Sequence, residues 1–95
     1  MYVKIHKGST IVLAICDENL IGKKFEEGDL CLDVNEAFYK GEKKTKEEVL
    51  ELLKEYKNVN IVGEESVKVG IESGVISKDS IITIGGIPHA QFFVL

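Results

Sequence analysis

Residues 81–91 read Ile81-Ile82-Thr83-Ile84-Gly85-Gly86-Ile87-Pro88-His89-Ala90-Gln91, and they place an apolar run directly before a glycine pair, a proline and a histidine. The run 81–84 is apolar or β-branched and is bounded by Ser80 and Gly85, which predicts a strand buried on both faces in the middle of a sheet. The glycines permit positive φ angles, and the proline fixes its own φ and keeps the preceding residue extended. We therefore expect a stiffened turn that presents His89 at the end of a central strand.

His89 has two interpretations. An imidazole titrates at about pH 6.5, so a histidine held by a stiff turn is suited to act as a general acid or base. The alternative is structural, with a ring nitrogen bonded to a loop carbonyl. We favour the structural role because no partner nucleophile is adjacent in the sequence.

Gly85 and Gly86 also have two interpretations. Consecutive backbone N–H groups at such a turn can hold an anion. A tight turn requires the same two glycines, and the sequence has neither a dinucleotide-binding glycine pattern nor a P-loop. The turn without a ligand is therefore favoured.

The segment 17–29 is the predicted counterpart of this turn. It mixes charged residues, glycines and apolar anchors without a clear period, and so reads as an ordered loop. Loops on a rigid scaffold often carry functional residues. If the loop and the turn meet, the candidate binding residues are His89, Pro88, Gly85, Gly86, Asp17, Glu18, Gly22, Lys23 and Gln91. No catalytic residue is assigned.

The length and composition are those of one soluble globular domain. The chain has 95 residues, of which 44% are hydrophobic and 29% are charged. No apolar run approaches the roughly 20 residues needed to cross a bilayer, and the N-terminus lacks the layout of a signal peptide. We expect a cytoplasmic protein without a membrane partner.

The charge pattern disfavours broad nucleic-acid binding. The net charge is −4, and all 12 basic residues are lysines, so the bidentate fork of arginine is missing. Lysines at 23–24 and at 40–46 form two basic patches, but glutamates are interleaved with the second, which is typical of a solvated face. RNA or ribosome contact through these patches stays open as an alternative.

The cysteines and histidines do not predict a metal site. Cys16 and Cys31 match neither a redox motif nor a zinc knuckle, so we expect buried, reduced thiols. Carboxylates next to Cys16 would raise its thiol pKa and make it a poorer nucleophile. His6 and His89 are the remaining zinc-type ligands, and all four residues are scattered. We predict no metal and no cofactor.

Several further elements are indicated by local patterns. Residues 2–6 and 10–16 predict an antiparallel hairpin, residues 29–34 a third strand, and residues 35–39 a single helical turn capped by Asn35. Thr45 and Glu48 form a capping box that opens a helix ending near Asn58. Asn60 is predicted to cap a second helix that stops at Gly74.

These elements assemble into an α+β fold. We expect one domain over residues 1–95, with a mainly antiparallel sheet of about four strands and two main helices packed on one face. The apolar segment 91–95 is predicted to pack on the domain or to contact a second copy of the chain, which would give a homo-oligomer.

The order of several short segments resembles DUF424, an archaeal family of unknown function. The likeness begins with residues 3–6, 16–18, 22–25 and 28–30, continues with 38–39 and 60–64, and ends with 86–91. The resemblance implies an archaeal cytoplasmic protein with an α+β fold and suggests a link to translation or information processing. It brings no established activity.

Two functions are carried forward. We expect a non-enzymatic binding or adaptor domain with a protein partner, because the domain is small and acidic, ends in an apolar segment and lacks a recognisable catalytic set. The alternative is a small enzyme or a metabolite- or anion-binding protein whose site is formed by the 17–29 loop and the Gly85–His89 turn. Adjacency of these two segments is the geometric test.

Overall fold

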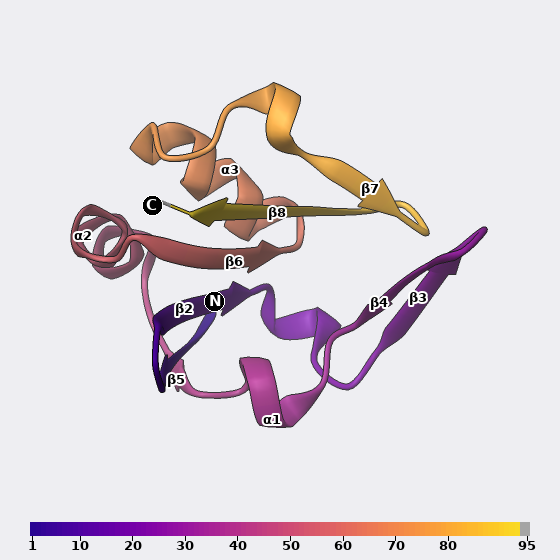
Figure 1. The fold of residues 1–95 in the computed structure, drawn as a ribbon, viewed down its shortest axis with the longest axis horizontal. Helices are drawn as coiled ribbons and strands as arrows, with labels where there is room; N and C mark the ends of the chain where they lie inside the picture. Colours follow the sequence, from indigo (N-terminus) through magenta and orange to yellow (C-terminus); the bar gives the residue numbers. More distant parts are fainter. Residues whose placement is uncertain (94–95) are drawn as a thin grey trace.

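The computed structural model describes residues 1–93 and contains a mixed six-stranded sheet, a separate two-stranded hairpin and three α-helices (Figure 1). In chain order the elements are β1 (Tyr2–Lys7), β2 (Ile11–Cys16), the 3₁₀ turn η1 (Glu18–Leu20), β3 (Lys24–Glu27), β4 (Leu30–Asp33), α1 (Glu36–Tyr39), β5 (Glu42–Lys43), α2 (Lys46–Glu55), β6 (Asn58–Val62), α3 (Glu64–Ser73), the 3₁₀ turn η2 (Lys78–Ser80), β7 (Ile82–Ile84) and β8 (Ile87–Phe93). The order of strands in the large sheet is β5-β1-β2-β6-β8-β7.

The α+β class and the antiparallel character are confirmed, but the sheet is larger than expected. All neighbouring strands run antiparallel except β2 and β6, which are parallel. The predicted hairpin is present, with Tyr2 paired to Cys16 and Lys7 to Ile11. Within residues 1–93, no helix is long and apolar enough to cross a membrane.

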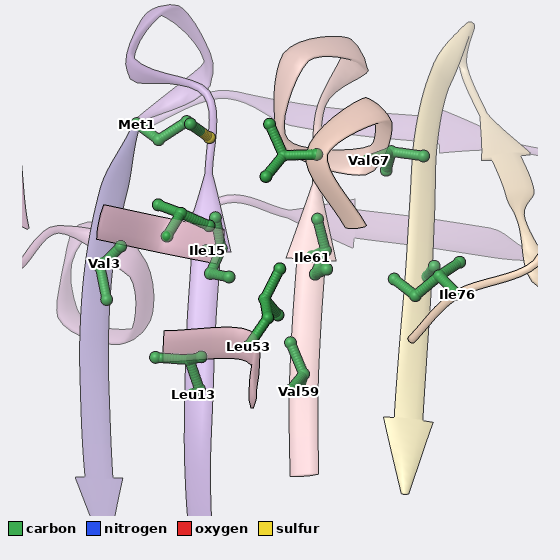
Figure 2. Packing of buried hydrophobic residues seen from close by; sticks show 12 residues of the cluster. Met1, Val3, Leu13, Ile15, Leu53, Val59, Ile61, Val67 and Ile76 are labelled. Atoms are coloured by element: carbon green, nitrogen blue, oxygen red, sulfur yellow. The ribbon is translucent and has the colours of Figure 1, made fainter. Parts of the chain in front are cut away.

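Each face of the large sheet packs against different elements. One face places Leu13, Ile15, Val59 and Ile61 against Leu53 of α2 and Val67 of α3 (Figure 2). The other face places Ala14, Cys16, Val62 and Ile84 against α1, η1 and the β3–β4 hairpin. Figure 1 shows α3 on one side of the sheet and α1 with this hairpin on the other. The helices α2 and α3 therefore cover one face, as predicted.

The strand at 81–84 is not central, which corrects the first expectation. β7 covers only Ile82–Ile84 and lies at the edge of the sheet, and Ile82 is 50% exposed. Gly85 and Gly86 have φ angles of 58° and 84° and join β7 to β8 in a two-residue hairpin turn. An apolar run of this kind predicts burial on both faces, but β7 has one neighbouring strand, β8, and its other edge is the edge of the sheet.

β8 was missed because it contains Pro88, which seldom occurs inside a sheet. Here the proline carbonyl accepts from Gly63 N at 2.9 Å. The carbonyl of Gly63 accepts instead from Val67 N, the first hydrogen bond of α3, so no N–H is needed from residue 88. His89 consequently lies within a strand between β6 and β7 and not on a turn.

The segment around Asn60 was also misassigned. Asn58–Val62 is the central strand β6, and α3 begins after Gly63. The segment 17–29 is not a continuous loop, because it contains η1 and β3. The caps at Asn35 and Thr45, the Thr45–Glu48 capping box and the left-handed Gly74 are confirmed. Local patterns were reliable where the cap and its helix are neighbours in sequence.

Gly63 forms the junction between β6 and α3, and its replacement tests this geometry. Its φ of 106° and ψ of 155° belong to a region that only glycine adopts readily. A Cβ at this position would also collide with the carboxylate of Asp17. Gly74 has a similar φ of 86° with open space around it, which makes it a matched control.

We predict that Gly63→Ala lowers the free energy of unfolding by about 3 kcal/mol or more, whereas Gly74→Ala costs about 1 kcal/mol of backbone strain. Urea denaturation of both variants measures the difference. Equal losses would show that the contact with Asp17 is unimportant.

Candidate functional site

The 17–29 segment and the Gly85–His89 segment do meet. Gly85 N donates to Glu27 Oε1 at 3.0 Å. A Cβ on Gly85 would lie 3.2 Å from Cβ of Phe25, so the turn rests directly on β3. Phe25, Ile84 and Ile87 share one apolar cluster. The backbone N–H that was considered for anion binding is thus already bonded to a carboxylate of the chain.

Asp17 holds the start of α3. Its Oδ1 accepts from Ser66 N at 2.8 Å and from Ser66 Oγ at 2.7 Å, and its Oδ2 accepts from Glu65 N at 3.1 Å. The side chain of Ser66 is fully buried and Asp17 is 8% exposed. A carboxylate at a helix N-terminus satisfies free N–H groups and complements the dipole. Asp17 therefore acts as a helix cap supplied from a distant strand.

His89 is half-buried on β8, and its Nδ1 lies 3.0 Å from the carbonyl oxygen of Ile61. Because a carbonyl only accepts, this nitrogen carries the hydrogen, and Nε2 is the acceptor in the neutral ring. Burial lowers the pKa of His89, and the bond to Ile61 opposes that shift. The structural interpretation of His89 is the one that matches these contacts.

The remaining predicted residues are dispersed around this region. Gly22 N donates to Val34 O at 2.7 Å, and the Glu18 carboxylate lies 3.4 Å from Lys43 Nζ in an exposed ion pair. Lys23 is exposed and contributes backbone bonds to Leu20 and Val34. Gln91 is exposed on β8 opposite Asn60. The nine predicted residues therefore do not converge on one site.

Cys16 and Tyr39 are buried in the same apolar cluster. Burial is the main cause that raises the pKa of Cys16 to about 12, with the charge of Asp17 adding to it. Burial also raises the pKa of Tyr39, whose hydroxyl donates to Asn60 Oδ1 at 2.7 Å. Cys31 is exposed on β4, contrary to the expectation that both thiols are buried. Among residues 1–93, no group of three His, Cys, Asp or Glu side chains is arranged to hold a metal.

A cavity of about 400 Å³ lies between α2 and α3, and the sequence reasoning did not find it. Leu50, Leu53 and Val75 supply its apolar surface, and Glu47, Glu51 and Glu72 are among its polar lining residues. We call this cavity the α2–α3 groove. The sequence contains one indication of this groove: Leu50 is apolar but does not belong to the fully buried residues of α2.

The two helices that line the α2–α3 groove are both acidic. α2 carries four glutamates and two lysines, and α3 carries three glutamates and one lysine, which together give −4, the value of the whole chain. By contrast, residues 1–16 contain Lys4 and Lys7 and no carboxylate side chain. The helical layer is therefore acidic and the first hairpin basic, and the segment 17–29, with five carboxylates and two lysines, is acidic as well.

The aromatic residues near the C-terminus divide between core and surface. Phe92 packs on the helix-covered core, whereas Phe93 is 61% exposed. Val94 and Leu95, the rest of the predicted apolar segment, lie outside the described residues. A continuous flat patch of Phe92 and Phe93 is not formed, because alternate residues of a strand point to opposite faces.

Comparison with known proteins gives a family and no activity. The family profile described as "Protein of unknown function (DUF424)" matches residues 5–95. The crystal structure of an uncharacterized conserved protein from Methanopyrus kandleri is similar, with 32% sequence identity and a TM-score of 0.81, and the match covers 99% of this chain and 90% of that chain. No curated protein matches this sequence.

Because Asp17 bonds the first N–H groups of α3, a small change to its side chain should cause a large loss of stability. Asp17→Asn removes the charge and part of the acceptor capacity, so we expect about 2 kcal/mol less unfolding free energy. Asp29→Asn makes the same replacement at an exposed turn and should change stability by less than about 0.5 kcal/mol. Similar losses in denaturant unfolding would contradict the assignment.

The lowered pKa of His89 predicts a pH dependence of stability. The unfolded chain gains this proton below about pH 6.5, whereas the folded chain keeps His89 neutral to lower pH. Stability should therefore be fully present above that pH and decrease as the pH falls. Between about pH 7.5 and about pH 5.5, wild type should lose more unfolding free energy than His89→Gln. Parallel pH profiles would show that His89 makes no contribution.

Proposed function

The chain belongs to DUF424, a family of proteins of unknown function, and we propose that it is a non-enzymatic binding domain whose α2–α3 groove takes a cationic, amphipathic segment of a protein partner. The observation that carries the proposal is the coincidence of an apolar groove with two helices that each have a net charge of −2, with Glu47, Glu51 and Glu72 among the lining residues. A partner that offers apolar side chains and lysines or arginines would match both features.

The size of the groove suits side chains better than a large ligand. Its volume of about 400 Å³ is near the lower end of the range for small-molecule sites. Leu50 and Val75 are only partly buried, so they retain surface for an incoming apolar group. Amphipathic helices commonly insert apolar side chains into grooves between helices. Such a segment would place its charged face towards the glutamates.

The ion pairs of the groove are weak enough to exchange. Lys54 Nζ lies 3.1 Å from Glu51, and Lys46 Nζ lies 3.0 Å from Glu72, with all four side chains at least half exposed. Exposed pairs of this kind contribute on the order of 0.5 kcal/mol each. Within residues 1–93, Glu47 has no ion-pair partner. An incoming cation can therefore be accommodated at little cost to the fold.

The alternative of a metabolite or anion site at the 17–29 segment and Gly85–His89 is less well supported. Adjacency of the two segments favours it. However, the Gly85 N–H, the Asp17 carboxylate and His89 Nδ1 each have a partner within the domain. A ligand there would have to displace contacts that support α3 and β8. The acidic groove requires no such displacement.

The proposal predicts a charge effect that depends on position. The probe is a fluorescein-labelled synthetic helix with leucines on one face and lysines on the other, and its binding is followed by anisotropy. Glu47→Lys should weaken binding at least about tenfold, because it places a like charge at the rim of the groove.

Glu26→Lys is the control, since it changes the net charge equally on an exposed position of β3. We expect it to alter the dissociation constant by about twofold or less. Equal weakening by both variants would indicate attraction to overall charge and would contradict a specific groove.

A further inference from the structure

A second, smaller cavity adjoins the α2–α3 groove at Glu72. It has a volume of about 160 Å³ and is lined by Lys46, Glu65, Lys68, Val69 and Glu72. We call it the α3 cavity, because all of these residues except Lys46 belong to α3. Glu72 lines both the α3 cavity and the α2–α3 groove, so its side chain lies at the boundary between them.

An ion pair within the chain occupies this boundary. Lys46, the first residue of α2, places its Nζ 3.0 Å from Oε2 of Glu72. The two side chains are 52% and 51% exposed, so the pair is open to solvent and to an incoming charge. Lys46 itself lines the α3 cavity and is not among the lining residues of the groove. The pair therefore joins a carboxylate shared by both cavities to an ammonium group on one side.

The two sides of the boundary differ in charge. The groove is lined by three glutamates and one lysine. The α3 cavity is lined by two lysines and two glutamates, and within residues 1–93 Lys68 takes part in no ion pair. If an external cation engages Glu72, then Lys46 and Lys68 face Glu65 alone, and the α3 cavity gains a positive balance. An acidic group is then favoured on that side.

From the shared Glu72 and the different charges on its two sides, and on the basis of the function proposed above, we infer that the partner segment presents apolar, basic and acidic side chains in that order. The apolar side chain enters the α2–α3 groove, and the basic residue takes the place of Lys46 beside Glu72. The acidic residue pairs with Lys46 and Lys68 over the α3 cavity. One ion pair within the chain is thus exchanged for pairs of the same kind with the partner.

The helix geometry determines the spacing of the two charges. Lys68 and Glu72 are four residues apart on α3, which corresponds to about 6 Å along the helix axis. A partner helix that lies along α3 presents residues i and i+4 with the same separation on one face. The basic and acidic residues of the partner are therefore about one turn apart, and the basic residue is the nearer to the apolar end.

The test compares two capped, fluorescein-labelled synthetic helices of identical composition by anisotropy. Leucines occupy one face of one half, and the other half carries a lysine and a glutamate one turn apart in a neutral background. The lysine is nearer to the leucines in the first peptide, and the glutamate is nearer in the second. This order is the same whichever way the helix runs in the groove. We expect wild-type protein to bind the first peptide at least about fivefold more tightly than the second.

A protein variant tests the residues directly. The double exchange Lys46→Glu with Glu72→Lys preserves the composition and the net charge, and it permits the same ion pair in reverse. It should reverse the preference, so that the second peptide binds more tightly. The control is the double exchange Glu18→Lys with Lys43→Glu, an exposed pair at 3.4 Å outside both cavities. The control should keep the preference of the wild type.

The outcomes separate this inference from the proposed function. Equal binding of the two peptides by wild-type protein would overturn the order of charges, and this comparison does not depend on the folding of a variant. An unchanged preference in a folded Lys46–Glu72 exchange variant would overturn it as well. In both cases the groove itself stands if Glu47→Lys still weakens binding. If neither peptide binds wild-type protein at millimolar concentration, the proposed function and the inference both fail.

Discussion

The carboxylate of Asp17 is the contact on which the rest of the structure depends. Asp17 N donates to Val62 O at 3.1 Å, and Gly63 N donates to Pro88 O at 2.9 Å, so the ends of β2, β6 and β8 are joined in one row. The Asp17 side chain then bonds the first N–H groups of α3. This junction fixes the direction in which α3 crosses the sheet. The direction of α3 in turn determines the space between α2 and α3, which is the α2–α3 groove.

The same junction separates structural residues from those available for binding. Asp17, His89 and Gly85 looked like site residues because they are polar or permissive residues at the ends of strands. In the fold, each supports a neighbouring element through a hydrogen bond. The surface that we propose for binding lies elsewhere, in the α2–α3 groove.

Predictions from the sequence succeeded where the deciding contacts are local. The β1–β2 hairpin, the Thr45–Glu48 box and Gly74 each involve residues within one turn or one hairpin of one another. Asn60 is a good cap and predicts the start of a helix at β6, whereas α3 begins after Gly63 and its first N–H groups bond Asp17, which is distant in sequence. β8 was missed because Pro88 is unfavourable in a sheet unless a partner such as Gly63 has its carbonyl otherwise engaged. The α2–α3 groove arises from tertiary packing, which no local pattern reports.

Site-specific photo-crosslinking in cells of the native organism tests most directly whether the helical layer is the functional surface. A photoreactive amino acid would replace Leu50 in the α2–α3 groove and, in separate strains, Lys23 or Gln91 near the 17–29 and Gly85–His89 segments. The account predicts a discrete crosslinked partner from position 50, through a segment rich in lysine or arginine, and none shared with positions 23 and 91. Crosslinks confined to positions 23 and 91 would contradict it and return the site to the segments around Asp17 and His89.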